Sequence, residues 1–383
     1  AGRLTAHVEL LADDSVRGRG AGYPELHAAG DDVAAQFEEA GLAKAGDGWF
    51  QTWIEPGGPE GKPVELRNVI GVIPGTGKGS VVLGAHYDHL GLGWPDVRAG
   101  HEGKIHNGAD DNASGIAVLI EVAKRLREMH KPTRSIVFVA FDGEEWGRKG
   151  SKHYVRAMSE YPVTECFAMV NLDTVGRLEG RKIQVLGSDT ASEWKHIAMG
   201  IGFTTGIQSK CVAEDPGGSD QVSFHEMQVP AVQIFSGLHT DYHRPTDTAD
   251  KIDYEGMLDV AAFVQEMVAY LSERDRPMTT TFGTAKEPAE SQPKTGRKVS
   301  LGTMPDFAFP GPGVKVASVI DASPAAKAGI VAGDVLLAIG GEDLKDLRGF
   351  SNALKKHAPG DRITIRLKRG EEELEVEAEL VAR

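Results

Sequence analysis

The sequence predicts an α/β fold, with a mixed, mainly parallel sheet flanked by helices, followed by a small β-rich second domain. Two observations indicate this. Short β-branched and apolar runs alternate with amphipathic helical patterns in the first part of the chain, as in parallel strands joined by crossover helices. Proline, threonine and charged residues then dominate before a second set of strand patterns begins. We therefore expect a first domain over residues 1–272, a linker over 273–298 and a second domain over 299–383.

Four segments of the first domain are nearly all apolar, as are strands that are buried on both faces of a sheet. These predicted strands are Ser80–Ala85, Arg134–Phe141, Cys166–Leu172 and Ala231–Phe235. Apolar residues at helical spacing predict helices over Asp31–Ala40, Ser114–Met129 and Tyr254–Leu271. The order of these elements is the one expected of an open α/β sheet.

The residues after position 298 are numerous enough to form a small independent domain. Its predicted strands are Val314–Ile320, Val335–Ile339, Arg362–Leu367 and Leu374–Leu380, and its predicted helix is Leu347–His357. Strands outnumber helices here, so the second domain is predicted to be β-rich.

Composition excludes several classes of function. Lys plus Arg number 42 against 56 for Asp plus Glu, and the net charge of −14 repels nucleic acid. No run of about 18 apolar residues occurs, so no membrane insertion is expected. Two cysteines are too few for a disulfide framework. The chain begins at Ala1 without an initiator Met, which fits either a cleaved signal peptide or an artificially trimmed chain.

Acidic and imidazole side chains gather just past the ends of the predicted strands, where open α/β sheets place their sites. The clusters are His86-Tyr87-Asp88, Asp110-Asp111-Asn112, Glu144-Glu145, Asn171-Leu172-Asp173 and Tyr242-His243. Imidazole nitrogens and carboxylate oxygens suit zinc, manganese or cobalt. Two histidines and three carboxylates exceed what one ion needs, which favours two ions about 3.5–4 Å apart that share one carboxylate.

These clusters lie in segments that resemble, in order and spacing, the successive motifs of the M28 family of zinc aminopeptidases. The segments are Ala85–Gly91, Asn107–Gly115, Phe141–Gly147, Asn171–Arg177 and Tyr242–Thr248. The resemblance extends over about Leu4 to Leu271 and implies the zinc exopeptidase fold. It also implies a secreted or periplasmic hydrolase that removes N-terminal residues from peptides with a free N-terminus.

The resemblance assigns a role to each matching residue. Two Zn²⁺ ions, which Mn²⁺ or Co²⁺ could replace, are expected on five ligands: His86, Asp111, Glu145, Asp173 and His243. Asp111 matches the bridging carboxylate, with Asp110 the neighbour most easily confused with it. Asp88 is expected to orient the His86 imidazole. Glu144 matches the general base, and Tyr242 matches the phenol that stabilises the oxyanion.

The residues leave other interpretations open. The same site could serve a carboxypeptidase or a dipeptidase, or a glutaminyl cyclase with a single zinc. Alternatively, the zinc could be structural, in a protein that acts only through its second domain. Three further histidines near the first two motifs, His89, His101 and His106, are expected to be solvated loop residues.

The second domain resembles the PDZ domains of bacterial HtrA-type proteases. The resemblance rests on Ser323–Gly329 and Gly333–Ile339. In such domains a loop presents backbone amides to the C-terminal carboxylate of a peptide. Here the loop would contain Leu301, Gly302, Thr303 and Met304, so C-terminal peptide tails are possible partners. The alternative is a module that packs against the first domain as a lid or spacer and binds no peptide.

Overall fold

A computed structural model describes the chain except for residues 130, 214–217, 283–297, 307, 308, 310 and 383. The chain divides into two compact units. The first unit comprises Ala1–Val97, His101–Ser236 and His243–Gly283. The second comprises Arg98–Gly100, Gly237–Tyr242 and Thr284–Arg383.

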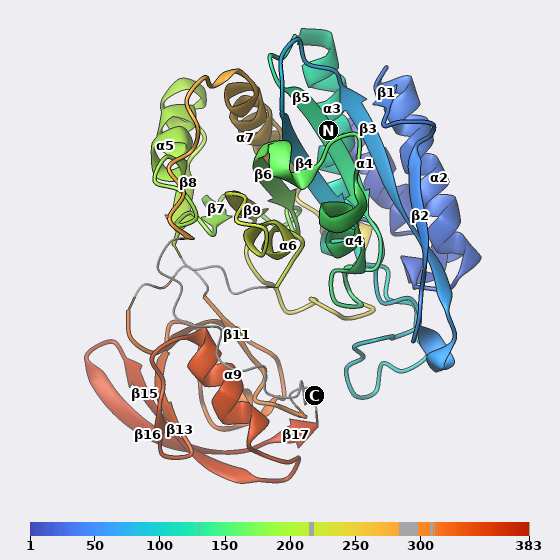
Figure 1. Cartoon of the computed structure of the whole chain (residues 1–383). Coiled ribbons are helices and arrows are strands. Elements are labelled where there is room, and N and C mark those ends of the chain that lie inside the picture. The colour runs from blue at the N-terminus through green and yellow to red at the C-terminus, as the bar shows by residue number, and fades with distance from the viewer. Residues whose placement is uncertain (130, 214–217, 283–297, 307–308, 310, 383) are drawn as a thin grey trace. The chain divides into compact units, whose positions relative to one another are not determined.

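The first unit is built on a nine-stranded sheet (Figure 1). Its strands are β1 (Ala43–Lys44), β2 (Phe50–Glu55), β3 (Val64–Ile73), β4 (Ser80–His86), β5 (Ser135–Phe141), β6 (Cys166–Leu172), β7 (Ile183–Leu186), β8 (Ser209–Val212) and β9 (Ala231–Phe235). Their order is β1-β3-β5-β4-β6-β9-β7-β8, with β2 also paired to β3. The central strands β5, β4, β6 and β9 run parallel, whereas β3 and β7 pair with their central neighbours antiparallel. This confirms the predicted mixed, mainly parallel centre.

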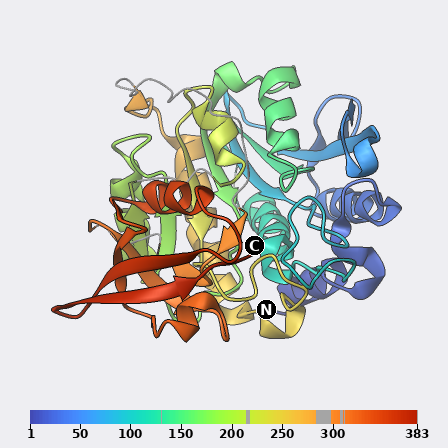
Figure 2. The same ribbon diagram turned by 90° about the horizontal axis from the view of Figure 1, so that it is seen from below.

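Helices cover both faces of this sheet. They are α1 (Gly2–Leu11), α2 (Pro24–Glu39), α3 (Gly115–Met129), α4 (Lys149–Ala157), α5 (Trp194–Thr205), α6 (Gln221–His225) and α7 (Tyr254–Glu273). Residues of α1, α2, α3, α5 and α7 share one hydrophobic cluster, and α4 and α6 contribute to the cluster on the other face. Figure 2 shows α1 and α3 on one side of the sheet and α4 on the other.

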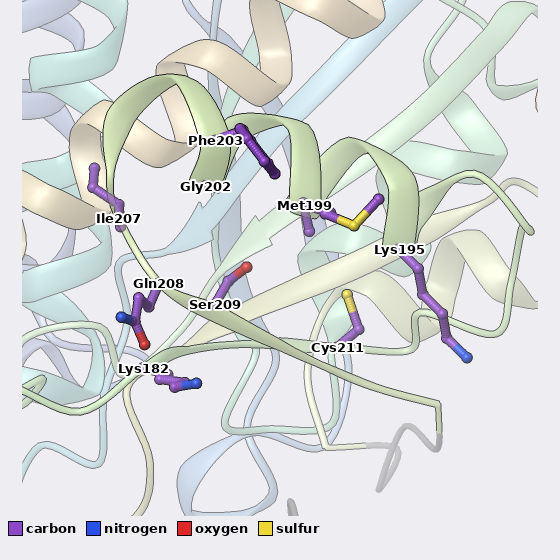
Figure 3. Close-up of a pocket in the computed structure, with 10 residues that line it drawn as sticks. Lys182, Lys195, Met199, Gly202, Phe203, Ile207, Gln208, Ser209 and Cys211 are labelled. Carbon is purple, nitrogen blue, oxygen red and sulfur yellow. The ribbon is translucent and has the colours of Figure 1, made fainter.

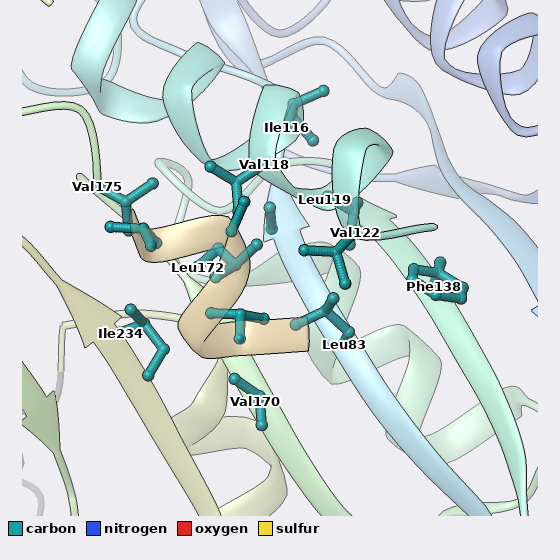
Figure 4. Packing of buried hydrophobic residues seen from close by; sticks show 14 of the residues in the cluster. Leu83, Ile116, Val118, Leu119, Val122, Phe138, Val170, Leu172, Val175 and Ile234 are labelled. Carbon is teal, nitrogen blue, oxygen red and sulfur yellow. The ribbon is translucent and has the colours of Figure 1, made fainter. Parts of the chain in front are cut away.

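The larger cluster fills the space between α3, α7 and the central strands (Figure 4). Leu83, Phe138 and Val170 of neighbouring strands belong to this cluster together with Leu119 and Val122 of α3. The next residues along the strands, such as Val82 and Val137, belong to the opposite cluster because side chains alternate along a strand. The strands are therefore apolar on both faces, as their sequences predict.

All four predicted strands of the first unit are present within one residue at each end. The structure differs in the first predicted helix, which begins at Pro24 rather than at Asp31. Pro24 occupies the first turn, where its fixed φ and missing N–H are tolerated. The apolar periodicity from Val33 onward marks only the later part of this helix.

The second unit contains a six-stranded sheet of order β11-β12-β13-β15-β16, with β14 paired to β13. The strands of this unit are β10 (Val299–Ser300), β11 (Thr303–Pro305), β12 (Val314–Val319), β13 (Val335–Ile339), β14 (Glu342–Asp343), β15 (Arg362–Arg369), β16 (Glu372–Glu379) and β17 (Val381–Ala382), and its helices are α8 (Pro324–Lys327) and α9 (Leu347–Lys355). Leu336, Leu354 and Ile365 lie in its own hydrophobic core. The expected β-rich architecture is confirmed.

Part of the segment interpreted as a linker contacts the first unit. The amide of Thr279 donates to Glu193, Ala191 forms a bridge with Thr280, and Met278 is buried. The remainder of the proposed linker, residues 283–297, lies outside the described residues. Among the helices that the structure describes, none is long and apolar enough to cross a membrane.

Candidate metal centre

The side chains expected to bind metal lie beyond the carboxyl ends of the parallel central strands. His86 is the last residue of β4, Glu145 follows β5, and Asp173 follows β6 directly. Asp111 lies in the helical turn before α3, and His243 lies in the loop after β9. Because the carboxyl ends of parallel strands meet at one edge of a sheet, residues far apart in sequence converge there.

Asp111 lies between two groups of side chains. Its Oδ1 is 3.3 Å from Nε2 of His86, and that nitrogen is 3.7 Å from Oδ1 of Asp173. Its Oδ2 is 3.2 Å from Nε2 of His243, and that nitrogen is also 3.2 Å from Oε2 of Glu145. The two oxygens of one carboxylate thus face two separate donor groups.

The spacing and chemistry of these atoms fit divalent metal ions. Atoms bound tetrahedrally to zinc at about 2.0–2.1 Å lie about 3.3 Å apart, close to the 3.2–3.7 Å observed here. Asp111 is 2% exposed, and its Oδ2 has no hydrogen-bond partner among the described residues. Buried oxygens of this kind are costly unless a cation compensates them. The five residues therefore suit a pair of ions that share Asp111.

Neighbouring charges and hydrogen bonds shift the pKa values of these expected ligands. Burial opposes the charged form of Glu145, but the His243 imidazole and a hydrogen bond to His89 lower the pKa of Glu145 to about 2. Burial also opposes protonation of His86, but hydrogen bonds to Asp111 and Asp173 raise its pKa well above the ordinary value. Glu145 is therefore ionised at neutral pH and able to bind a cation.

The pKa of Glu144 is shifted in the opposite direction from that of Glu145. Burial, followed by the negative charges of Asp220, Glu145 and Asp173, raises the pKa of Glu144 well above its usual value, although the nearby His86 opposes this. A carboxylate whose proton affinity is raised in this way can take a proton from water and return it to a leaving group. The two adjacent glutamates are thus suited to different tasks.

The carboxylate of Asp88 fixes both glutamates through their backbone. Its Oδ1 accepts from the amide of Glu144 at 3.0 Å, and its Oδ2 accepts from the amide of Glu145 at 3.2 Å. Nδ1 of His86 lies 3.1 Å from the backbone carbonyl of Asp88 and 3.6 Å from its carboxylate. The carbonyl and the carboxylate of Asp88 thus both lie near the imidazole, and the expected orienting role of the Asp88 carboxylate stays a prediction.

Sequence reasoning missed the partner of His243. Nδ1 of His243 lies 3.1 Å from Oδ2 of Asp96, so this carboxylate orients the ring and leaves Nε2 facing Asp111. Asp96 lies in a loop that carries neither strand nor helix periodicity. No sequence signal links it to a residue 147 positions away.

The expectation of solvated loop histidines is wrong for two of the three. His89 is 1% exposed, and its Nδ1 lies 2.7 Å from Oε1 of Glu145. His106 is 0% exposed, and its Nδ1 contacts the carbonyl of Lys104 at 3.0 Å. His101 is half-buried. The fold thus buries the rings of His89 and His106.

Two buried groups fix the backbone of the ligand loops. The guanidinium of Arg19 donates to the carbonyls of Tyr87, Asn107 and Gly108, which flank the loops of His86 and Asp111. Oδ2 of Asp247 accepts from the amides of Asp110 and Asp111 at 2.9 and 3.1 Å. These contacts preorganise the metal ligands without using their side chains.

The side chain of Asp110 points away from the donor groups. Its Oδ1 accepts from the amide of Gly176 at 2.6 Å and from the hydroxyl of Ser114 at 3.1 Å. Asp111, rather than Asp110, thus faces both groups. Tyr242 directly precedes His243 but falls in the second unit, so its role at the oxyanion stays a prediction.

The proposed peptide-binding loop of the second unit is fixed by backbone contacts. The carbonyls of Leu301 and Gly302 accept from the amides of Ala325 and Ile320, and Leu301 is buried. Gly302 has a φ of 82°, and its amide donates to the hydroxyl of Ser300. Thr303 and Met304 begin strand β11. Binding of a carboxylate by this loop stays a prediction.

The first unit also has a pocket whose lining differs from that of the candidate metal centre. It lies between α5 and β8, and the side chains of Met199, Phe203 and Ser209 line it together with those of Lys195 and Cys211 (Figure 3). None of the described residues that line it carries a carboxylate or an imidazole. It is therefore no alternative metal site.

Comparison with known proteins agrees with a metallopeptidase fold. Residues 68–268, more than half of the chain, match the sequence profile of peptidase family M28, and residues 285–380 match that of the PDZ domain. The chain belongs to peptidase family M28 and carries a PDZ domain.

Individual relatives match over parts of their length. Aminopeptidase YwaD of Bacillus subtilis is 29% identical over 188 residues, which are 46% of this chain and 37% of the relative. The alkaline phosphatase isozyme conversion protein of Escherichia coli is 29% identical over 41% of this chain and 47% of the relative. The chain thus spans less than half of the length of these relatives.

Solved structures share the fold at low identity. A zinc aminopeptidase from Bacillus subtilis matches with a TM-score of 0.58 and 17% identity, over 72% of this chain and 96% of that one. A glutaminyl cyclase of Bacteroides thetaiotaomicron matches with a TM-score of 0.59 and 19% identity, over 70% of this chain and 97% of that one. These similarities show the architecture of the first unit.

Proposed function

We propose that this chain is a metal-dependent aminopeptidase that removes N-terminal residues from peptides with the help of two zinc ions. The observation that carries the proposal is the position of Asp111, whose two oxygens face separate donor groups. Family membership and the aminopeptidases among the relatives support the same reaction class. Manganese or cobalt would fit the same ligands.

In this proposal, His86, Asp111 and Asp173 would hold one ion, and Asp111, Glu145 and His243 the other. When bound, such a pair lowers the pKa of water and polarises the peptide carbonyl.

The side chains transfer the proton, stabilise the oxyanion and bind the substrate amine. The Glu144 carboxylate takes the proton of the attacking water and delivers it to the leaving amine, which keeps the proton balance of hydrolysis. Asp88 fixes the backbone of Glu144 for this transfer. The Tyr242 phenol is proposed to donate to the developing oxyanion. The carboxylates of Glu144 and Asp173 would attract the free α-amine of the substrate.

Mass spectrometry of a mixed peptide set tests the reaction directly. Incubation with the protein is expected to remove residues successively from the N-terminus. N-terminal acetylation and a metal chelator should each block this loss, because the first removes the charged amine and the second removes the ions. The residues lost first would also reveal the side-chain preference.

The same spectra distinguish the rivals. Loss of residues from the C-terminus would identify a carboxypeptidase, and cleavage restricted to two-residue substrates would identify a dipeptidase. Loss of ammonia from peptides with N-terminal glutamine would identify a glutaminyl cyclase, an activity named for a structural neighbour. No change to any peptide despite bound metal would favour a non-catalytic zinc protein.

We also propose that the PDZ domain captures C-terminal tails of longer substrates through the loop that contains Gly302 and Thr303. For a long peptide, amidation of the C-terminus is then expected to raise KM by about tenfold at unchanged kcat, since it removes the carboxylate that increases the local substrate concentration. Steady-state kinetics on matched free and amidated peptides measure this difference. Equal KM values would favour a PDZ domain that serves as a lid or spacer.

A chain that ends at Lys298 is the control for this prediction. Single amino-acid amides are too short to reach a second binding site, so the shortened chain should hydrolyse them as fast as the full chain does. Loss of that activity would instead assign the PDZ domain a structural role.

A secreted or periplasmic location is a further proposal, made on the family resemblance. The free thiols of Cys166 and Cys211 are compatible with an oxidising compartment, because burial raises the pKa of Cys166 to about 12 and that of Cys211 above its ordinary value. Fractionation of cells that produce the protein would test the location.

A further inference from the structure

We infer that His89 is a positioning residue that fixes the orientation of the Glu145 carboxylate, so that only one carboxylate oxygen faces His243 and Asp111. The inference rests on the metal site of the proposed function and deepens it. It adds a residue that is not one of the five expected ligands, although it lies in the motif segment Ala85–Gly91.

The contact between the two side chains is short and buried. His89 is 1% exposed, and its Nδ1 lies 2.7 Å from Oε1 of Glu145. The other oxygen of Glu145, Oε2, lies 3.2 Å from Nε2 of His243. Each oxygen of the Glu145 carboxylate therefore has its own partner, and the hydrogen bond from His89 occupies the one that points away from His243.

A ring nitrogen of His89 lies within 4.8 Å of carboxylate oxygens of Asp111 and Glu145, as in a metal-binding group, but the individual distances favour a hydrogen bond. Two atoms on one tetrahedral zinc ion lie about 3.3 Å apart, as do the facing atoms of His243 and Glu145 at 3.2 Å. The 2.7 Å between His89 and Glu145 is instead the length of a strong hydrogen bond to a charged acceptor. Nδ1 of His89 is also 3.9 Å from Asp111, farther than the facing atoms of His243.

The surroundings of His89 hold its ring in one place. Its backbone amide donates to the carbonyl of Arg19 at 3.0 Å, and Gly20 forms a bridge with it. Gly108 packs against the ring so closely that a Cβ there would lie 2.5 Å from Cδ2 of His89. The ring also meets His243 edge to face, with 5.8 Å between the ring centroids. Because these contacts fix the ring of His89, its hydrogen bond restricts the orientation of the Glu145 carboxylate.

The other ring nitrogen is consistent with this assignment. Nε2 of His89 is buried and has no hydrogen-bond partner among the described residues. With a proton on Nδ1, the ring donates to Oε1 of Glu145. Without this donor, the Glu145 carboxylate could rotate or bind an ion through both oxygens, so the second donor group would lose its geometry.

The experiment compares the full-length variants His89→Leu and His89→Gln with the unchanged protein. His89→Leu removes the donor, whereas the side-chain amide of His89→Gln can still donate to Oε1. Zinc affinity is measured by competition with a chromophoric chelator, and bound cobalt is followed by its visible absorption. We expect His89→Leu to weaken one of two sites by about 10–100-fold and to change the cobalt spectrum, and His89→Gln to restore most of both.

His106→Leu is the matched control, because it removes another fully buried imidazole that contacts a backbone carbonyl. It should lower thermal stability without changing metal affinity. Unchanged metal affinity in His89→Leu would overturn the inference. Equal losses in His89→Leu and His89→Gln would also overturn it, and would make His89 a direct ligand.

A second measurement requires no substitution. In the zinc-loaded protein, correlation spectra of ¹⁵N-labelled histidines should show His89 with a proton on Nδ1 and no metal on either ring nitrogen. A metal-bound nitrogen in His89 would overturn the inference even if the variants failed to fold. Failure of the proposed metal site would differ from both outcomes, since the unchanged protein itself would then bind no zinc. Failure of the proposed peptidase reaction would appear only in the peptide assay and would leave these metal measurements unchanged.

Discussion

Replacement of Glu144 with glutamine is expected to lower kcat by about 10²–10⁴-fold while the protein keeps its metal ions. Glutamine has nearly the same shape as glutamate but cannot accept the proton of the attacking water. The amide of residue 144 would still donate to Asp88, so the adjacent ligand Glu145 should keep its place. Steady-state kinetics together with metal analysis of the same sample measure both parts of the prediction.

The adjacent variant Glu145→Gln is the informative comparison. It removes a charged ligand beside His243, so it should lose metal as well as activity. Full activity in Glu144→Gln would rule out this residue as the general base. Loss of metal from Glu144→Gln would instead place its carboxylate among the ligands.

Replacement of Asp111 with alanine should abolish activity and weaken both metal sites together. Its two oxygens face both donor groups, so no other single side chain is shared between them. The backbone at this position should persist, because Asp247 fixes the amides of residues 110 and 111. Isothermal titration of the metal-free protein with zinc would measure the number of sites and their affinities.

Asp110→Asn provides the control for this variant. Asp110 is fully buried next to Asp111 but contacts Gly176 and Ser114 rather than the donor groups. Its replacement should lower the melting temperature and leave two zinc sites. Retention of one intact site in Asp111→Ala would contradict a shared carboxylate.

The sequence predicts the centre of the fold well because its signals are local. Strands such as Ser135–Phe141 are apolar on both faces, and only the interior of a helix-covered sheet accommodates such segments. Elements with mixed burial carry weaker signals. The strand Phe50–Glu55 alternates between half-buried and exposed positions, and the sequence analysis did not identify it.

The residues of the two donor groups are predicted better than those that support them. His86, Glu145 and Asp173 follow strongly patterned strands, so the sheet alone determines the edge at which they meet. His89 and Asp96 depend on the path of a loop without periodicity. Their contacts with Glu145 and His243 appear only when segments distant in sequence fold together.

The sequence likewise does not predict the contacts of Arg19, a buried cation that fixes the loops of the site. Arg19 is fully buried, although arginine is ordinarily exposed. Burial lowers its pKa to about 10, while the charges of Asp111 and Asp88 oppose that change, so it remains charged at neutral pH. Nothing in its local sequence indicates that it binds the carbonyls of two segments distant from it in sequence, at Tyr87 and at Asn107 and Gly108.

Anomalous X-ray diffraction at the zinc edge, from crystals of the zinc-loaded protein, tests the central claim most directly. The shared carboxylate predicts two peaks about 3.5–4 Å apart, one on each side of Asp111. One peak should lie beside His86 and Asp173, and the other beside Glu145 and His243. A single peak at full zinc occupancy, or two peaks that do not share Asp111, would contradict the account.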